Sequence, residues 1–263
     1  MKKYALLCAV LALHAGASFA KDRNEIRMAS EGAYPPFNTT TADGSMAGFD
    51  IDIGNALCEE MKAKCTWVKQ EWDGMIPALV SRKFDAIIAS MSITEERKAK
   101  VDFTDKYYAS PLALIAKKGS ELRPDLELLK GKKVGVQRGT VSDNFATKYW
   151  DGKGLQIVRY AKQDEAYLDL RAGRLDAAFV DYLEAYGGFL TKPEGEGYDV
   201  AGDRLFGRNA EEKAVIGEGI GIAVRKRDKE LTEKLNQALA AIRANGKYDA
   251  IQKKYFPMDI YGN

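Results

Sequence analysis

The sequence predicts an α/β protein of two similar lobes, and three observations support this fold class. Short apolar runs, such as 86–89 and 112–116, have the length of buried strands and alternate with segments of helical hydrophobic period. The chain has 263 residues, and the roughly 243 that follow a leader segment are near the size at which one core divides into two. The third observation is an internal repeat.

The repeat consists of RKFDAIIAS at 82–90 and GRLDAAFVD at 173–181, which are offset by 91 residues. Each copy has the pattern of a helix end, a turn and a buried strand, although a match this short also arises by chance in α/β proteins. If the copies are equivalent, each lobe brings one polar residue to the carboxyl end of a strand, Ser90 in one and Asp181 in the other. Ligands of open α/β sheets bind at such ends, so two facing lobes form one cleft.

The first 20 residues have the pattern of a secretory signal peptide. Lys2 and Lys3 precede an apolar run, and Ser18 and Ala20 stand at the small-residue positions of a cleavage site. We therefore expect the mature, secreted chain to begin at Lys21. Elsewhere the sequence has no segment long and apolar enough to span a bilayer.

Composition excludes several classes of function. The sequence has 40 basic and 38 acidic residues. Cleavage of the leader would remove two lysines, so the mature chain is formally neutral. Without a basic run, nucleic acid is not expected as a partner. The single histidine, His14, lies in the leader, which excludes histidine-dependent triads and imidazole zinc sites in the mature protein. No metal and no cofactor are expected.

The two mature cysteines, Cys58 and Cys65, are expected to form a disulfide. They are seven residues apart in a chain bound for an oxidising compartment. Two free, buried thiols are the alternative. A disulfide would leave no thiol for catalysis.

Helical periodicity is clear in one segment near the start of the mature chain and in two near its end. Asn245-Gly246 separates the last two. The apolar positions are Ile53, Leu57 and Met61, then Leu231, Leu235, Leu239 and Ile242, then Tyr248, Ile251 and Tyr255.

Seven motifs follow one another along the mature chain. They are EGAYPPF (31–37), GFDIDIGNALCEEMKAKCTW (48–67), WDGMIPAL (72–79), DAIIASMSITEERK (85–98), VGVQRGT (134–140), GRLDAAFVD (173–181) and KKYFPMDIYG (253–262). In this order, and over residues 25–263, the sequence resembles the periplasmic solute-binding proteins of polar amino acid ABC transporters. It is most similar to the lysine/arginine/ornithine- and histidine-binding group.

The resemblance implies the type II periplasmic binding protein fold, in which two three-layer α/β lobes are joined by two hinge strands. Lobe one is then expected to comprise 21–109 and 217–263, and lobe two 110–202. The crossovers are expected at 109–111 and after Gly202. The stretch 203–216 is longer than in the basic amino acid binders, so it remains a crossover region without an assigned boundary.

Arg97 is the expected clamp for a ligand α-carboxylate. Thr94 is predicted to cap a helix with Glu95 and Glu96 in its first turn, which lets the Arg97 guanidinium fold back toward the preceding strand end. A guanidinium binds a carboxylate through two parallel hydrogen bonds, which lysine cannot do. The resemblance implies the same role. Alternatively, Arg97 is a solvated arginine in a charged run.

Ser90 and Ser92 are predicted to point the same way from an extended segment, with Met91 between them, and all three are expected at the binding site. The hydroxyls and neighbouring main-chain groups would serve the ammonium and the carboxylate. After the turn at Gly139, the backbone N–H groups of Thr140 and Val141 open a predicted helix, and such a start binds anions.

For the remaining site residues the resemblance is the main guide. It implies that Asp181 binds the α-ammonium and that Tyr34 and Trp72 sandwich the ligand side chain. Glu31 stands where basic amino acid binders carry an aspartate for the distal cation of the ligand. Gln137 places an amide where an apolar residue is frequent.

Arg138 also departs from the group. Facing the pocket it would repel a cationic ligand and favour a neutral or carboxylated one, but we expect it to face solvent.

The expected function is capture of an L-amino acid, with a basic one (lysine, arginine, ornithine or histidine) as the first choice. A monomeric protein would deliver it by hinge closure to the membrane permease of an ABC importer. The alternatives are a binder of a neutral amino acid or opine, a partner of a sensor, and a periplasmic lyase of the same fold. The lyase would act on arogenate- or prephenate-like substrates and would recruit Glu31 or Glu184.

Overall fold

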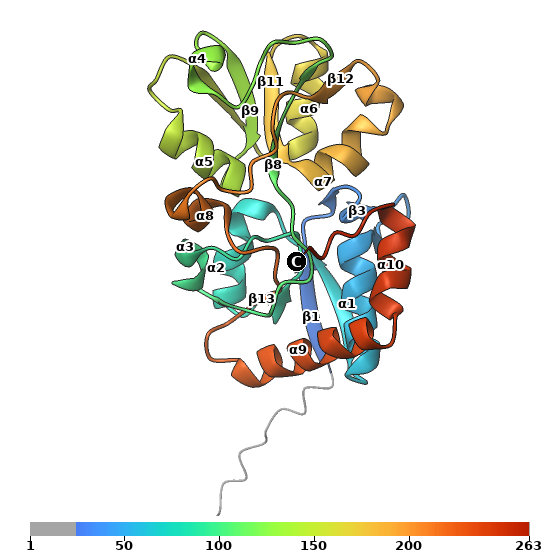
Figure 1. The fold of residues 1–263 in the computed structure, drawn as a ribbon. Helices are drawn as coiled ribbons and strands as arrows, with labels where there is room; N and C mark the ends of the chain where they lie inside the picture. Colours follow the sequence, from blue (N-terminus) through green and yellow to red (C-terminus); the bar gives the residue numbers. More distant parts are fainter. Residues whose placement is uncertain (1–24, 263) are drawn as a thin grey trace, which may run out of the picture.

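Two five-stranded sheets, one in each of two lobes, organise residues 25–262, which are the part of the chain that this computed structural model describes (Figure 1). The expected signal peptide, residues 1–20, lies outside this range. Buried apolar side chains form four clusters, one on each face of each sheet. The predicted two-lobed α/β fold is therefore confirmed. In the described range, no helix combines the length and the apolar character needed to cross a membrane.

The first lobe contains both ends of the described chain. Its sheet has the order β5 (Lys64–Lys69), β1 (Glu25–Ser30), β6 (Ala86–Ile87), β13 (Ala223–Val224) and β7 (Asp102–Phe103). One face is covered by α1 (Phe49–Glu60), α9 (Lys229–Ala244) and α10 (Lys247–Tyr255), and the other by η1 (Trp72–Gly74), α2 (Met75–Val80) and α3 (Glu95–Lys98). A small antiparallel sheet adds β2 (Ala33–Tyr34), β3 (Asn38–Thr40) and β4 (Met46–Ala47).

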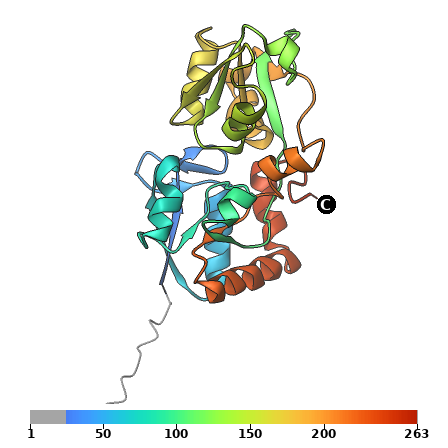
Figure 2. The ribbon, with the colours of Figure 1, turned by 90° about the vertical axis from the view of Figure 1, so that its left-hand side faces the viewer.

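The second lobe is formed by the middle of the chain. Its sheet has the order β10 (Gln156–Tyr160), β9 (Lys133–Gln137), β11 (Ala177–Asp181), β8 (Leu112–Lys117) and β12 (Tyr198–Val200). One face carries α4 (Leu126–Leu129), α5 (Val141–Tyr149) and α8 (Ala210–Ile216). The other carries α6 (Gln163–Arg171), α7 (Tyr182–Glu184), η2 (Ala185–Leu190) and η3 (Pro193–Gly195). Figure 2 shows the two lobes stacked end to end from a second direction.

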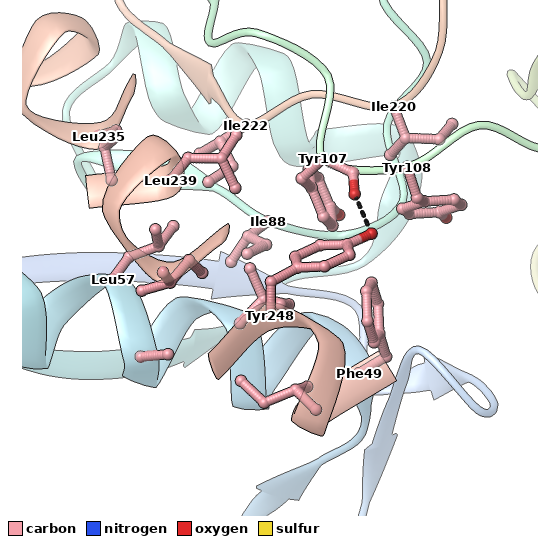
Figure 3. Packing of buried hydrophobic residues seen from close by; sticks show 14 of the residues in the cluster. Phe49, Leu57, Ile88, Tyr107, Tyr108, Ile220, Ile222, Leu235, Leu239 and Tyr248 are labelled. Carbon is pink, nitrogen blue, oxygen red and sulfur yellow. Dashed lines mark hydrogen bonds between the residues drawn. The ribbon is translucent and has the colours of Figure 1, made fainter. Parts of the chain in front are cut away.

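Three helices form where the periodicity predicts them, as α1, α9 and α10. Their apolar stripes meet on one face of the first sheet, where Leu57, Leu235 and Leu239 pack together with Phe49 and Tyr248 (Figure 3). The Tyr248 hydroxyl donates a 2.6 Å hydrogen bond to the carbonyl of Tyr107, so the one polar atom that this ring brings into the core is satisfied.

The predicted disulfide between Cys58 and Cys65 is present and joins the end of α1 to β5. In the chain-entropy view, such a bond stabilises the fold by restricting the unfolded chain.

The chain passes from the first lobe to the second at 109–111 and returns after α8, where Glu218 and Gly219 bond to the backbone of Ile93. Around the crossings, Tyr108 pairs with Ile220, and Leu112 pairs with Leu205. The stretch 203–216, which the sequence leaves unassigned, ends in α8, and α8 packs against α5 of the second lobe. Asn209 caps α8 by accepting a 2.9 Å hydrogen bond from the backbone of Glu212.

The internal repeat has the same local structure in both lobes. β1 pairs with β6 in parallel through Met28 and Ala86, and β9 pairs with β11 in parallel through Val134 and Ala177. The aspartate of each copy accepts a backbone hydrogen bond at the start of the neighbouring strand. Asp85 accepts from Arg27 at 3.1 Å, and Asp176 accepts from Lys133 at 2.8 Å. The two copies therefore align the carboxyl ends of β6 and β11 toward the other lobe.

The two copies differ at the turn that ends their helices, which gives a stability prediction. Arg82 and Gly173 occupy equivalent positions after α2 and α6, with φ of 63° and 72°. At both positions the same two backbone hydrogen bonds close the end of the helix, in the pattern of a Schellman motif. A left-handed conformation is strained for arginine but not for glycine, so Arg82→Gly is expected to raise the free energy of unfolding by ~1 kcal/mol.

Urea denaturation of Arg82→Gly and of the reciprocal Gly173→Arg checks this prediction. The reciprocal variant should lose a similar amount of stability. Equal midpoints for the wild type and both variants would contradict it.

Candidate functional site

A cavity lies between the lobes, at the carboxyl ends of β6 and β11. Both lobes contribute to its wall, as expected of a ligand site in an open α/β sheet. The lining residues are Glu31, Tyr34, Trp72, Ala89, Ser90, Ser92 and Arg97 from the first lobe, and Gln137, Thr140, Val141, Ser142, Gln163, Val180 and Asp181 from the second. All of the expected ligand-binding residues except Met91 are among them.

Met91 lies in the core instead. It is 2% exposed and packs in the apolar cluster under α2, with Met75, Leu79 and Val101. The sequence placed it at the site because it stands between two serines.

The two serines do not alternate from one extended segment, so that prediction is wrong. β6 ends at Ile87, and Ser90 has a φ of 56°, in the left-handed region. Its hydroxyl donates to Oδ2 of Asp50 at 3.0 Å. Asp50 is fully buried and also accepts from the Tyr107 hydroxyl at 2.7 Å and from the Asn38 amide at 2.9 Å. This buried carboxylate therefore holds the turn at Ser90, a residue that lines the cavity.

Arg97 extends from α3 into the cavity wall. The Thr94 hydroxyl accepts a 3.3 Å hydrogen bond from the Arg97 backbone, as the predicted cap requires. The guanidinium is buried, stacks over Trp72 at 5.2 Å and donates from Nη1 to the Ser92 carbonyl at 3.0 Å. From Nη2 it also reaches the Gly139 carbonyl of the second lobe at 3.2 Å.

The charge of Arg97 is not neutralised by a protein carboxylate. Within residues 25–262, none lies within the 4.0 Å that defines an ion pair. Burial lowers the pKa of the guanidinium to about 10. A buried charge without a partner is unfavourable, so the cavity favours an anion beside Arg97.

The start of α5 faces Arg97 from the second lobe. Gly139 turns the chain with a φ of 70°, and the Thr140 hydroxyl accepts a hydrogen bond from the Asp143 backbone at 3.3 Å. The Thr140 N–H, expected to be free, donates to the Gln137 carbonyl at 3.4 Å, whereas the backbone N–H groups of Val141 and Ser142, in the first turn, have no carbonyl partner within the helix. Together with Arg97 they present unpaired N–H donors, an arrangement that favours an anion.

Asp181 ends β11 on the opposite side of the cavity. It is 8% exposed, and burial raises its pKa to about 6, against the hydrogen bonds from Ser110 and Tyr34 that lower it. The Tyr34 hydroxyl approaches Oδ2 at 3.4 Å from the first lobe. A cationic group placed here would offset the unfavourable burial of this carboxylate.

Glu31 supplies a second buried carboxylate, with 2% exposure. Burial raises its pKa to about 7, although the hydrogen bond from Gln137 acts in the opposite direction. That bond runs from Nε2 of Gln137 to Oε1 of Glu31 at 2.8 Å and crosses between the lobes.

Arg138 does not line the cavity, as expected. It is half exposed and donates from Nε to Oδ2 of Asp73, in the first lobe, at 2.7 Å. The Asp73–Arg138 pair therefore connects the lobes at the outer edge of the cavity.

Some lining residues escape prediction from sequence. Ser142 follows Val141 in the first turn of α5, so the helix-start argument extends to it. Gln163 carries no local signal, because it reaches the cavity only when the connection between β10 and α6 folds toward Glu31.

A cavity between two α/β lobes, with a cation that has no ion-pair partner among the described residues and with buried carboxylates, defines a two-lobed binding protein for small charged ligands. The chain belongs to the bacterial extracellular solute-binding proteins, family 3, whose family model matches residues 26–258.

Named relatives cover essentially the whole chain. The L-arginine-binding protein of Pseudomonas aeruginosa is 51% identical over 264 residues, covering 100% of both proteins. The lysine/arginine/ornithine-binding periplasmic protein of Escherichia coli is 44% identical, covering 95% of this chain and 94% of that protein. Among solved structures, an ancestral arginine-binding protein bound to arginine matches with a TM-score of 0.80 and 38% identity, covering 89% of this chain and 99% of the other. These relatives are named as binding proteins and not as enzymes.

Proposed function

We propose that this protein captures a basic L-amino acid in the periplasm and delivers it to the membrane permease of an ABC importer. One observation carries the proposal: the same cavity holds one buried guanidinium, Arg97, which has no carboxylate partner among residues 25–262, and two buried carboxylates, Asp181 and Glu31. The names of the relatives support it, and one of them is named as a periplasmic protein.

The charges of the cavity match a ligand with one negative and two positive groups. The α-carboxylate would lie against Arg97 and the start of α5, and the α-ammonium against Asp181. The side chain would run between Tyr34 and Trp72, and its distal cation would reach Glu31. A neutral amino acid or an opine would leave Glu31 without a cation, and burial, which raises its pKa to about 7, would then leave it only partly ionised at neutral pH.

Closure of the lobes would couple binding to transport. Four contacts cross between the lobes around the cavity: Glu31 with Gln137, Arg97 with the Gly139 carbonyl, Tyr34 with Asp181, and Asp73 with Arg138. A ligand gains contacts to both walls only when the lobes are closed, so its differential affinity shifts the population toward that state. The permease would then recognise the closed form.

Thermal-shift measurements with the twenty amino acids, ornithine and citrulline test the proposal. A ligand at a hundred times its Kd stabilises a protein by ~2.7 kcal/mol, which raises the Tm measurably. We expect the largest shifts from basic amino acids. Shifts confined to neutral or acidic amino acids, or no shift at all, would refute the proposal.

Affinity for a basic amino acid is expected to fall as the pH falls below 7. The pKa of Glu31 is about 7 and that of Asp181 about 6, so both carboxylates lose their charge on acidification, Glu31 first. A proton then competes with the ligand cation, and each unit below pH 7 weakens binding ~tenfold at first. Because both pKa values lie above those of the unfolded chain, ionisation of these groups destabilises the ligand-free closed form, and a bound cation offsets this effect.

Calorimetric titrations at pH 8, 7 and 6 measure this dependence. Glu31→Gln should bind weakly at all three values and lose most of the slope between pH 7 and 6. An affinity for arginine or lysine that is constant from pH 8 to 6 would contradict the assignment of Glu31.

The Asp73–Arg138 pair is expected to stabilise the closed form. This exposed ion pair forms only when the lobes meet, so Asp73→Asn should weaken ligand binding modestly, ~two- to fivefold, without touching the ligand. Added salt should reduce the difference from the wild type. A double-mutant cycle with Arg138→Gln provides the control, and purely additive effects of the two substitutions would argue against a coupled pair.

A further inference from the structure

Gln163 has a side chain that the protein itself does not satisfy. It is the first residue of α6, is 1% exposed and lines the cavity. Within residues 25–262, neither its Nε2 nor its Oε1 has a hydrogen-bond partner. Because a buried amide without partners is unfavourable, such a group points to a ligand.

Gln163 lies at the same end of the cavity as Glu31. Gln137 donates from Nε2 both to Oε1 of Glu31, at 2.8 Å, and to the carbonyl of Ala161, at 3.2 Å. This second bond fixes the connection between β10 and α6, two residues before Gln163, beside the carboxylate. The amide hydrogens of Gln137 are thereby committed, so Gln137 does not supply a donor to Gln163.

The nearest hydroxyl on α6 is also committed. Tyr167 is four residues after Gln163 and therefore on the same face of the helix. Its hydroxyl donates to Oε2 of the buried Glu184 at 2.6 Å, so toward Gln163 it can act only as an acceptor for the amide N–H, an interaction that acts against the burial that raises the pKa of Tyr167. The Gln163 carbonyl oxygen and Oε2 of Glu31 thus remain as acceptors for a ligand.

We propose that Gln163 is a specificity-determining residue that accepts a hydrogen bond from the distal group of the ligand and, together with Glu31, selects a guanidinium. The inference rests on the proposed function and narrows its ligand to L-arginine. A guanidinium carries five N–H donors in a rigid plane and no acceptor, so it can bond to a carboxylate and an amide oxygen at once. An ammonium is a compact charge that Glu31 alone can neutralise.

Isothermal titration calorimetry with L-arginine, L-lysine and L-citrulline at pH 8, where Glu31 is ionised, tests the proposal. We compare the wild type with Gln163→Leu, and with Gln156→Leu as a matched control on the exposed start of β10. Gln163→Leu should lose at least tenfold in affinity for arginine and less than threefold for lysine. Gln156→Leu should resemble the wild type, and citrulline, which lacks the charge, should bind far more weakly than arginine.

The Tm of the ligand-free proteins separates ligand recognition from a structural role. Replacing an unsatisfied buried amide with an apolar side chain of similar size should leave the Tm unchanged or raise it. The inference would be overturned if Gln163→Leu lost equal affinity for arginine and lysine and had a lowered ligand-free Tm. It would also be overturned if the affinity of Gln163→Leu for arginine were unchanged, or if citrulline bound more tightly than arginine. In each of these cases the proposed function would stand. A wild type that binds no basic amino acid would instead refute the proposed function.

Discussion

Replacing Arg97 with alanine is expected to weaken binding of the basic amino acid by ~3–5 kcal/mol, a few hundredfold or more in Kd. The substitution would leave the ligand α-carboxylate in a closed cavity with only the first turn of α5 as its partner. The guanidinium makes hydrogen bonds to the carbonyls of Ser92 and Gly139 but has no ion pair among the described residues, so the loss should fall on binding more than on folding. Calorimetry at pH 8 measures the effect.

Two further variants sharpen this test. Arg97→Lys keeps the charge but loses the two-pronged hydrogen bonding, so an intermediate loss is expected. Arg227→Ala removes the same charge from an exposed turn before α9 and should bind like the wild type. A loss of less than tenfold in Arg97→Ala would rule out the clamp.

The second large effect is expected at Asp181. Asp181→Asn keeps the shape of the side chain, and its oxygen can still accept from the Tyr34 hydroxyl, but the α-ammonium loses its buried counter-ion. The expected loss is ~3 kcal/mol, more than a hundredfold in Kd. Since burial raises the pKa of Asp181 to about 6, the ligand-free variant should be at least as stable as the wild type at pH 8.

Asp199→Asn is the matched control for this substitution. It makes the same change on an exposed position of β12, in the same sheet, and should leave both affinity and Tm unchanged. If Asp181→Asn binds within tenfold of the wild type, the α-ammonium is held elsewhere.

Sequence reasoning succeeded where a residue's position follows from a few neighbours. The capping of α3 by Thr94 directs Arg97 toward the strand end, and Gly139 allows the turn that begins α5. The periodicities of α1, α9 and α10 are likewise contained in single segments, and the repeat predicted which strand ends face each other.

It failed where distant parts of the chain decide the outcome. Ser90 adopts a left-handed conformation and bonds to Asp50, 40 residues earlier, so strand alternation did not apply to it and Met91 turned into the core. Gln163 lines the cavity because the Gln137 side chain bonds to the connection between β10 and α6. No sequence motif predicts this bond or the position of Gln163. The packing of α8 on α5 likewise depends on the tertiary fold.

The position of Asp73 and Arg138 also makes this protein suitable as an optical sensor. The two side chains lie on opposite lobes and are about half exposed, so dyes attached there would separate when the lobes open. Both mature cysteines are already joined in the Cys58–Cys65 bond, so a thiol introduced at either position can be labelled selectively. Ligand concentration would then be read as a change in fluorescence, without any alteration of the residues that face the amino acid.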